Sequence, residues 1–222
     1  MLNILEADSI RKDFGDKPIL SDIYLKCQTG DIIGLLGRNG TGKSTLLNIV
    51  FGTLNADFKH ISVNGIILNQ PFKMKGTISF LNQVNFLPKH MTANKVVQLF
   101  GQQLEKTDLF EDNVLSTVKN TKIKHLSGGE LRYLEIKIIL NLNSKFIFLD
   151  EPFNGVAPIH IDIVKELIKA QSKTKGIILT DHDYTNVFDV ANKYLLLFDG
   201  GLKILKTKQD FINWGYIPDK QQ

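Results

Sequence analysis

The segment from Gly37 to Thr45 holds residues whose types and spacing suit phosphate chemistry. It fits the pattern G-x-x-x-x-G-K-[ST], in which glycines let the backbone approach a phosphate without Cβ clashes. The ammonium of Lys43 can reach the β- and γ-phosphates of a nucleotide, and the hydroxyl of Ser44 suits Mg²⁺. The pattern therefore predicts nucleoside triphosphate binding by Gly37, Arg38, Asn39, Gly40, Thr41, Gly42, Lys43, Ser44 and Thr45.

The sequence on either side of this segment predicts the elements that hold it. Ile32–Leu36 has the length and apolar character of a short buried strand, and Leu46, Leu47 and Val50 recur at helical spacing before Gly52, a helix stop. A strand, a glycine-rich turn and a helix N-terminus form an anion site, because unpaired N–H groups and the positive end of the helix dipole face one point. The alternative is a chance match in a glycine turn, and the flanking elements argue against it.

Two further apolar runs end in side chains that can act on a bound nucleotide. Phe146–Leu149 is followed by Asp150 and Glu151, and Ile177–Leu179 is followed by a segment that contains His182. Such unbroken runs are typical of parallel strands buried on both faces, and ligands of α/β sheets lie at the carboxyl ends of the strands. We therefore expect these side chains to converge with the phosphate-binding lysine.

The two adjacent carboxylates can divide the work of phosphoryl transfer. Asp150 can hold Mg²⁺ through water, and Glu151 can orient or deprotonate an attacking water. The alternative is that both are surface acids at the end of a strand. Their place beside a phosphate-binding segment favours the catalytic interpretation.

Composition limits the class of protein. The chain has 222 residues of which 43% are hydrophobic, which suits one large domain or a compact domain with a subdomain. No apolar run reaches membrane-spanning length, and the N-terminus lacks the pattern of a signal peptide. The single Cys27 excludes an intramolecular disulfide and favours a reducing cytosol. The net charge of +4 comes mainly from dispersed lysines, so we expect no nucleic acid partner.

Periodicity predicts the remaining elements. Alternating apolar residues in positions 1–30 indicate edge β-structure, and residues 92–142 have a mostly helical pattern that begins with a Thr92 cap. The tail from Lys208 onward is either a short helix or disordered. Other predicted pieces are β-structure at 61–68 and 78–81 and a β-hairpin around residues 199–201.

The segment Leu126–Glu130 reads Leu-Ser-Gly-Gly-Glu and resembles the signature motif of ATP-binding cassette (ABC) ATPases, usually written LSGGQ. The resemblance covers about residues 3–206. The signature and the segments at the two strand ends are similar to those of the subgroup that serves lipopolysaccharide export and branched-chain amino-acid uptake. The family's motifs occur in the family's order: the phosphate loop at 37–45, a glutamine loop at Gln83, the signature, Asp150-Glu151-Pro152 and a switch histidine at His182.

The resemblance implies roles that spacing alone leaves open. Phe14 would stack on adenine, although its spacing by itself favours a core aromatic. Gln83 would touch Mg²⁺ or the attacking water and relay the nucleotide state to a membrane subunit; the alternative is an ordinary loop glutamine. His182 would hold the γ-phosphate and Glu151; the alternative is a structural histidine.

The signature residues would act across a dimer. The resemblance implies that Ser127, Gly128 and Gly129, with Glu130, bind the γ-phosphate held by the other protomer. Ser127 and Glu130 also form an S-x-x-E capping box at a helix N-terminus, and the two roles are compatible.

The sequence departs from the family pattern at several positions. Glu130 stands where glutamine is commoner, and Ala157 stands where the family usually has aspartate, which places the coupling of the two nucleotide sites in question. The insert between Gln83 and Leu126 is short for a transporter subunit.

We expect the membrane partner to dock between Gln83 and Phe100, where Phe86, Leu87 and Pro88 are apolar residues next to the glutamine loop.

The resemblance implies a P-loop α/β ATPase with an antiparallel β edge subdomain and a helical subdomain at about residues 86–142, all within a single domain over residues 1–222. It implies that two copies sandwich two Mg²⁺·ATP and hydrolyse them, and that a separate transmembrane transporter subunit holds the protein at the cytoplasmic face of the membrane. The alternatives are a soluble ABC ATPase in repair, translation or cofactor assembly, and a module that dimerises on ATP without turnover.

Overall fold

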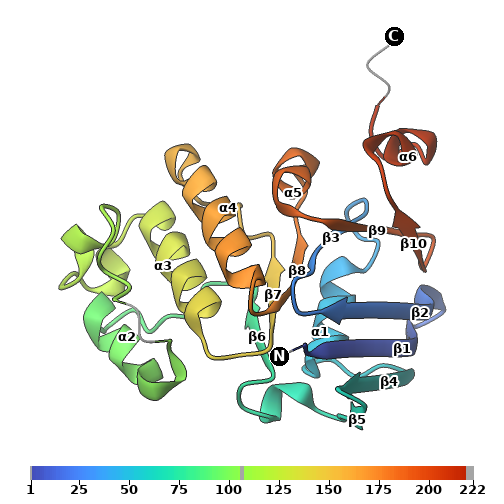
Figure 1. The fold of residues 1–222 in the computed structure, drawn as a ribbon, viewed down its shortest axis with the longest axis horizontal. Coiled ribbons are helices and arrows are strands. Elements are labelled where there is room, and N and C mark those ends of the chain that lie inside the picture. The colour runs from blue at the N-terminus through green and yellow to red at the C-terminus, as the bar shows by residue number, and fades with distance from the viewer. Residues whose placement is uncertain (1, 106–107, 219–222) are drawn as a thin grey trace.

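The structure is a computed structural model and describes residues 2–105 and 108–218. Its strands form two sheets (Figure 1). The smaller sheet is four-stranded and antiparallel, with the strand order β2-β1-β4-β5. Its strands are β1 (Ile4–Phe14), β2 (Lys17–Gln28), β4 (Phe58–Val63) and β5 (Ile66–Ile67).

The larger sheet is six-stranded, with the order β10-β9-β3-β8-β7-β6. All of its neighbouring strands are parallel except the hairpin of β9 and β10. The predicted strands before the phosphate loop and before Asp150 are therefore confirmed as members of one parallel sheet. Its strands are β3 (Ile32–Leu36), β6 (Ile78–Leu81), β7 (Phe146–Asp150), β8 (Gly176–Thr180), β9 (Lys193–Phe198) and β10 (Gly201–Leu205).

Both faces of the parallel sheet are covered, as the unbroken apolar run in β7 predicts. Phe146 and Phe148 point into a core shared with the antiparallel sheet and α1 (Lys43–Phe51). Ile147 and Leu149 point into a second core on the opposite face. The helices of that second face are α3 (Gly128–Asn141), α4 (Pro158–Ser172) and α5 (Tyr184–Val190).

The region between α2 (Ala93–Phe100) and α3 differs from the prediction that residues 92–142 are mostly helical. Its described residues form short 3-10 turns, other turns and isolated β-bridges at Leu104 and Lys122. Asp112 gives the physical reason: its carboxylate lies 2.6 Å from the Lys137 ammonium and accepts a hydrogen bond from the Tyr133 hydroxyl at 2.8 Å. Contacts with α3 therefore order this region. The turns are η2 (Gly101–Gln103), η3 (Ser116–Val118) and η4 (Ile123–His125), and η1 (Pro71–Lys73) lies earlier in the chain.

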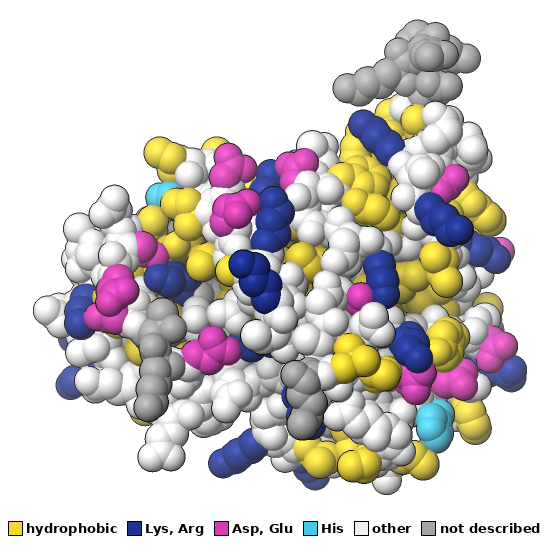
Figure 2. Space-filling model, in the orientation of Figure 1, with side chains coloured by type: hydrophobic (Ala, Val, Ile, Leu, Met, Phe, Trp, Pro, Cys, Tyr) yellow, Lys and Arg dark blue, Asp and Glu magenta, His cyan; other side chains and the backbone are white. Residues whose placement is uncertain are grey.

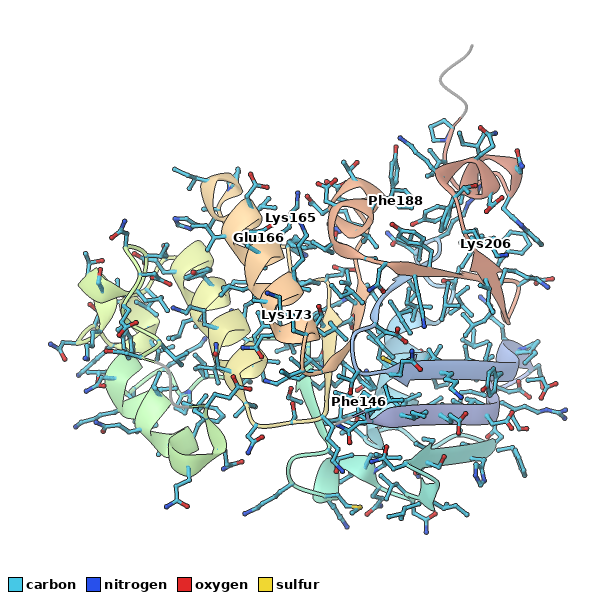
Figure 3. The ribbon with its side chains drawn as sticks, viewed as in Figure 1. Phe146, Lys165, Glu166, Lys173, Phe188 and Lys206 are labelled. Carbon is cyan, nitrogen blue, oxygen red and sulfur yellow. The ribbon has the colours of Figure 1, made fainter. Side chains whose placement is uncertain are left out.

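The described part of the tail forms a short helix, α6 (Lys208–Asn213), which was one of the two predicted outcomes. Phe211 is fully buried, and its ring centroid lies 5.2 Å from that of Phe188. Figure 3 labels Phe188 on α5. The surface over this region shows hydrophobic side chains gathered between α5 and α6 (Figure 2). Aromatic packing therefore fixes the C-terminal helix next to the element that follows His182.

Candidate functional site

The phosphate-binding segment joins β3 to α1 in the predicted strand–loop–helix order. Gly40 and Gly42 have left-handed backbones, with φ of 79° and 105°. A Cβ atom at Gly42 would lie 2.7 Å from Cγ2 of Ile19, so glycine is required there for space as well as for conformation. Among the described residues no side chain caps the N-terminus of α1, which leaves its first N–H groups directed toward a ligand.

Lys43 lies at the base of this loop and is almost fully buried. Its ammonium donates to the carbonyl oxygens of Gly37 at 2.7 Å and Arg38 at 3.2 Å. Burial lowers the pKa of Lys43, and the negative charges of Glu151 and other nearby carboxylates partly oppose that shift. The result is a positive charge held against the loop, where a phosphate oxygen can replace the carbonyl partners.

A cavity of about 430 Å³ lies over the loop and brings together segments that are far apart in the sequence. Of the predicted site residues, it is lined by Phe14, Asn39, Gly40, Gly42, Lys43, Ser44, Thr45, Gln83 and Glu151. Arg38 and Thr41 line a separate, smaller cavity instead. The loop, the glutamine that comes two residues after β6 and one of the two adjacent carboxylates therefore share one space.

Phe14 lies at this cavity and not in the core. Its side chain is 52% exposed, so the core placement favoured by spacing alone is wrong. The reason is that Phe14 is the last residue of β1, where the strand has passed the edge of the apolar core. An exposed ring beside a phosphate loop has the geometry for stacking on a base.

Asp150 lies beneath the cavity and is buried. Its Oδ1 accepts a hydrogen bond of 2.6 Å from the hydroxyl of Thr180 on the neighbouring strand β8. Its Oδ2 has no hydrogen-bond partner among the described residues. A buried oxygen left without a partner is costly, and a hydrated cation would satisfy it. Together with the Ser44 hydroxyl in the cavity wall, this oxygen fits a Mg²⁺ site.

Glu151 adopts a left-handed backbone with φ of 49°, which costs a non-glycine residue about 1 kcal/mol. Its N–H donates to the Thr180 carbonyl oxygen at 3.1 Å, and its carboxylate accepts from the Asn154 amide at 3.4 Å. This sharp turn directs the carboxylate into the cavity, whereas Asp150 remains beneath it. Such strain concentrates at functional turns.

His182 does not line the cavity. Its side chain is 58% exposed, and its Nδ1 lies 3.4 Å from Oδ1 of the buried Asp181. Asp181 also accepts hydrogen bonds from the N–H groups of Asp183 and Phe153, and burial is the main cause of its raised pKa. Sequence analysis did not identify Asp181 as the residue that holds this loop. Its position directly before His182, at the end of a buried strand, was the available signal.

Residues 20–154 match the family described as ABC transporter. The chain belongs to this family of ATP-binding proteins. The lipopolysaccharide export system ATP-binding protein LptB of Haemophilus influenzae is 30% identical over 96% of this chain and 94% of that protein. LptB of Escherichia coli is 29% identical over 89% of this chain and 88% of its own length.

Solved structures share the fold of this ABC protein. An ATP-binding subunit of an ABC transporter superposes with a TM-score of 0.83 and 21% identity, and covers 97% of this chain and 95% of its own. A nucleotide-free ATP-binding cassette from an ABC transporter superposes with a TM-score of 0.77 and 23% identity. The match covers 97% of this chain and 96% of that cassette. The predicted P-loop α/β fold with an antiparallel sheet is therefore confirmed.

The ABC signature lies at the N-terminus of α3 and outside the cavity. The predicted capping box is present: the Ser127 hydroxyl accepts from the Glu130 N–H at 3.3 Å, and the Glu130 carboxylate accepts from the Ser127 N–H at 2.8 Å. Ser127 and Gly128 are exposed. The chain therefore does not bring its own signature to the cavity over its own phosphate loop.

Ala157 lies beside the signature of the same chain. A Cβ atom at Gly129 would be 3.3 Å from the Ala157 nitrogen, and Ala157 is the N-cap residue of α4. Among the described residues no side chain caps this helix. The position where the ABC family usually has aspartate is therefore also a position where aspartate would cap a helix.

Proposed function

We propose that this chain is the ATP-hydrolysing subunit of an ABC transporter and acts on a separate membrane subunit. The observation that carries the proposal is the shared cavity of Lys43, Ser44, Gln83 and Glu151, with the unpartnered oxygen of Asp150 beneath it. A site for phosphate, a site for a cation and a carboxylate that can accept a proton from water then lie next to one another.

The residues of the site have separate tasks in this proposal. The loop N–H groups and Lys43 bind the phosphates of ATP, and Ser44, Asp150 and Gln83 would hold Mg²⁺, which neutralises phosphate charge when bound. Glu151 accepts a proton from water as the water oxygen bonds to the γ-phosphorus and the bond to the β-phosphate oxygen breaks. The products are ADP and inorganic phosphate.

A second copy of the chain completes the site in this proposal. Two copies pack head to tail, and the signature residues of each contact the ATP held by the other. The exposed N-terminus of α3 supports this arrangement, because the positive end of its dipole suits a γ-phosphate and the capping box engages the N–H of Glu130, which leaves the glycines before it exposed or half-buried. We include His182 in the same closed state, since its exposed side chain is free to approach a bound phosphate. Each copy is one domain over residues 1–222, with about 86–142 as its helical subdomain.

The transporter role is favoured over a soluble ATPase of repair, translation or cofactor assembly, because two relatives of similar length belong to the lipopolysaccharide export system. No helix in the described part of the chain is long and apolar enough to cross a membrane. From the same two relatives we propose that a separate transmembrane protein holds this chain at the cytoplasmic face.

Hydrolysis itself is the first test. The purified protein should release phosphate from ATP in the presence of Mg²⁺, and EDTA should reduce the release to background, because the Asp150 oxygen then lacks its cation. Phosphate release and gel filtration are measured on the same sample. ATP-dependent dimers without any phosphate release would support the alternative of a dimerising module without turnover.

The membrane partner should contact the glutamine loop. The predicted docking surface requires one correction: Leu87 is buried at 6% exposure, whereas Val84 and Phe86 are 74% and 42% exposed. A photo-crosslinking residue at Phe86 should therefore label a membrane protein in cells, and the same residue at Ile204, an exposed position on β10, should not. Crosslinks from Phe86 to ribosomes or DNA alone would favour a soluble ATPase.

Ala157→Asp should have two separable effects. Capping of α4 should raise the free energy of unfolding by ~0.5–2 kcal/mol. The added carboxylate should also strengthen coupling between the two ATP sites by ~1–3 kcal/mol, seen as a higher Hill coefficient or a tighter ATP-dependent dimer. Ala157→Asn is the matched control, since asparagine caps without a charge and should give only the first effect. Equal Hill coefficients and dimer constants for Ala157→Asp and the wild type would remove the coupling role.

A further inference from the structure

A buried ion pair on α3 lies behind the candidate active site and has no task in the proposed reaction. Arg132 is 5% exposed and Glu135 is fully buried, with 3.5 Å between the Arg132 guanidinium and a Glu135 oxygen. Both are one to two turns from Gly128, the signature residue at which the helix begins. Burying two charges is expensive unless they make further hydrogen bonds, so their partners are informative.

The Arg132 guanidinium holds the backbone of two catalytic segments at once. One of its nitrogens donates to the carbonyl oxygen of Asn82 at 2.8 Å, directly before Gln83. The other donates to the carbonyl oxygens of Asp150 at 3.1 Å and Glu151 at 3.0 Å. A planar guanidinium with donors in a fixed fork can make all of these bonds, whereas a lysine ammonium cannot span them.

Glu135 holds the other side of the glutamine loop. Its Oε1 accepts a hydrogen bond of 2.9 Å from the N–H of Phe86, three residues after Gln83. The ion pair therefore attaches α3 to the glutamine loop on both sides of Gln83. Through Arg132 it also attaches α3 to the turn that carries Asp150 and Glu151.

We propose that Arg132, supported by Glu135, is a positioning residue that sets the Glu151 carboxylate and Gln83 relative to each other for ATP hydrolysis. The inference rests on the proposed function, because it requires Glu151 to be the base. Arg132 acts through main-chain carbonyls and touches neither nucleotide nor water. Since the signature begins the same helix, the pair also links the position of α3 to the geometry of the catalytic turn.

Arg132→Lys tests the proposal, because it keeps the positive charge beside Glu135 and loses the fork. We expect kcat for ATP hydrolysis to fall about 10- to 100-fold, the size of effect that a misplacement of ~1 Å produces. The dissociation constant for a fluorescent ATP analogue should change less than about twofold, because the phosphate loop does not contact Arg132. Steady-state kinetics, analogue binding and thermal unfolding are measured on one preparation.

Lys175→Met is the control for the general cost of losing hydrogen bonds from a buried side chain to main-chain carbonyl oxygens. Lys175 is also buried and donates to the carbonyl oxygens of Leu140 and Leu142, and its ammonium lies 2.7 Å from Glu105. It lies near the opposite end of α3 from the signature. The Lys175→Met variant should unfold at a lower temperature than the wild type and have an unchanged kcat. An equal loss of kcat in Lys175→Met and Arg132→Lys would assign Arg132 a merely structural role.

The double variant that combines Arg132→Lys with Gln83→Ala tests specifically whether Arg132 acts through the glutamine loop. If Arg132 acts by placing Gln83 and Glu151, the combined loss of kcat should be smaller than the product of the two single losses. A product of independent losses, or wild-type kcat in Arg132→Lys, would overturn the inference. If Arg132→Lys does not fold, Glu135→Gln keeps the side-chain shape and takes its place: kcat should fall with ATP affinity retained, and an unchanged kcat overturns the inference.

The outcomes separate this inference from the proposed function. Wild-type kcat in Arg132→Lys together with an inactive Glu151→Gln variant contradicts only the positioning role. Full activity of Glu151→Gln contradicts the proposed base, and the positioning role is overturned with it.

Discussion

Lys43→Ala should abolish measurable ATP hydrolysis and weaken ATP binding. The Lys43 ammonium is the buried positive charge of the phosphate loop and lies within hydrogen-bond distance of two loop carbonyls. Without it, the charge on the β- and γ-phosphates lacks its neutralising partner, and the loop loses two internal hydrogen bonds. Phosphate release and binding of a fluorescent ATP analogue measure the two effects.

Lys169→Ala is the control for Lys43→Ala. Lys169 is an exposed lysine on α4 whose ion pair with Glu166 spans 3.0 Å at the surface. Its loss should leave hydrolysis unchanged, because exposed ion pairs contribute little. Turnover in Lys43→Ala equal to that of the control would contradict the assignment of the phosphate loop.

Glu151→Gln should retain ATP binding and lose ~10²–10⁴-fold in hydrolysis rate, the range for loss of a general base. Glutamine keeps the shape of the side chain in the strained turn and can still bond to Asn154. It cannot take a proton from water. Because ATP then stays intact, the head-to-tail dimer should persist in gel filtration with Mg²⁺·ATP, whereas wild-type dimers should dissociate as ATP is consumed.

Glu166→Gln, at the surface of α4, is the matched control and should behave as the wild type. A Glu151→Gln protein that is both monomeric and fully active would count against the base and against the dimer. A protein that is inactive but monomeric would count against the dimer alone. The two parts of the proposal are thus tested in one experiment.

Local features of this protein could be predicted from the sequence because they depend on residues close together in the chain. The phosphate loop, the strands β3, β7 and β8 and the capping box of Ser127 and Glu130 all agree with the structure. Each depends on periodicity, on glycine conformation or on a hydrogen bond between residues three apart. The motifs in order also sufficed to identify the family.

Features that depend on contacts between residues far apart in the sequence could not be predicted from it. Phe14 was favoured as a core residue and lies exposed at the cavity, because only the extent of the packed sheet decides which end of a strand is covered. Leu87 was expected on a docking surface and is buried. The region before α3 was expected to be mostly helical, yet Asp112 orders it through bonds to residues more than twenty positions away.

The sequence by itself therefore determined the chemistry available to this protein: a phosphate loop, two carboxylates at a strand end and a capped signature helix. The tertiary structure decided how these groups are held. Only folding buries Arg132 and brings it to carbonyl oxygens 18, 19 and 50 residues away in the chain. The physical reason is that a buried charge must find partners wherever the fold supplies them, and no local pattern encodes those partners.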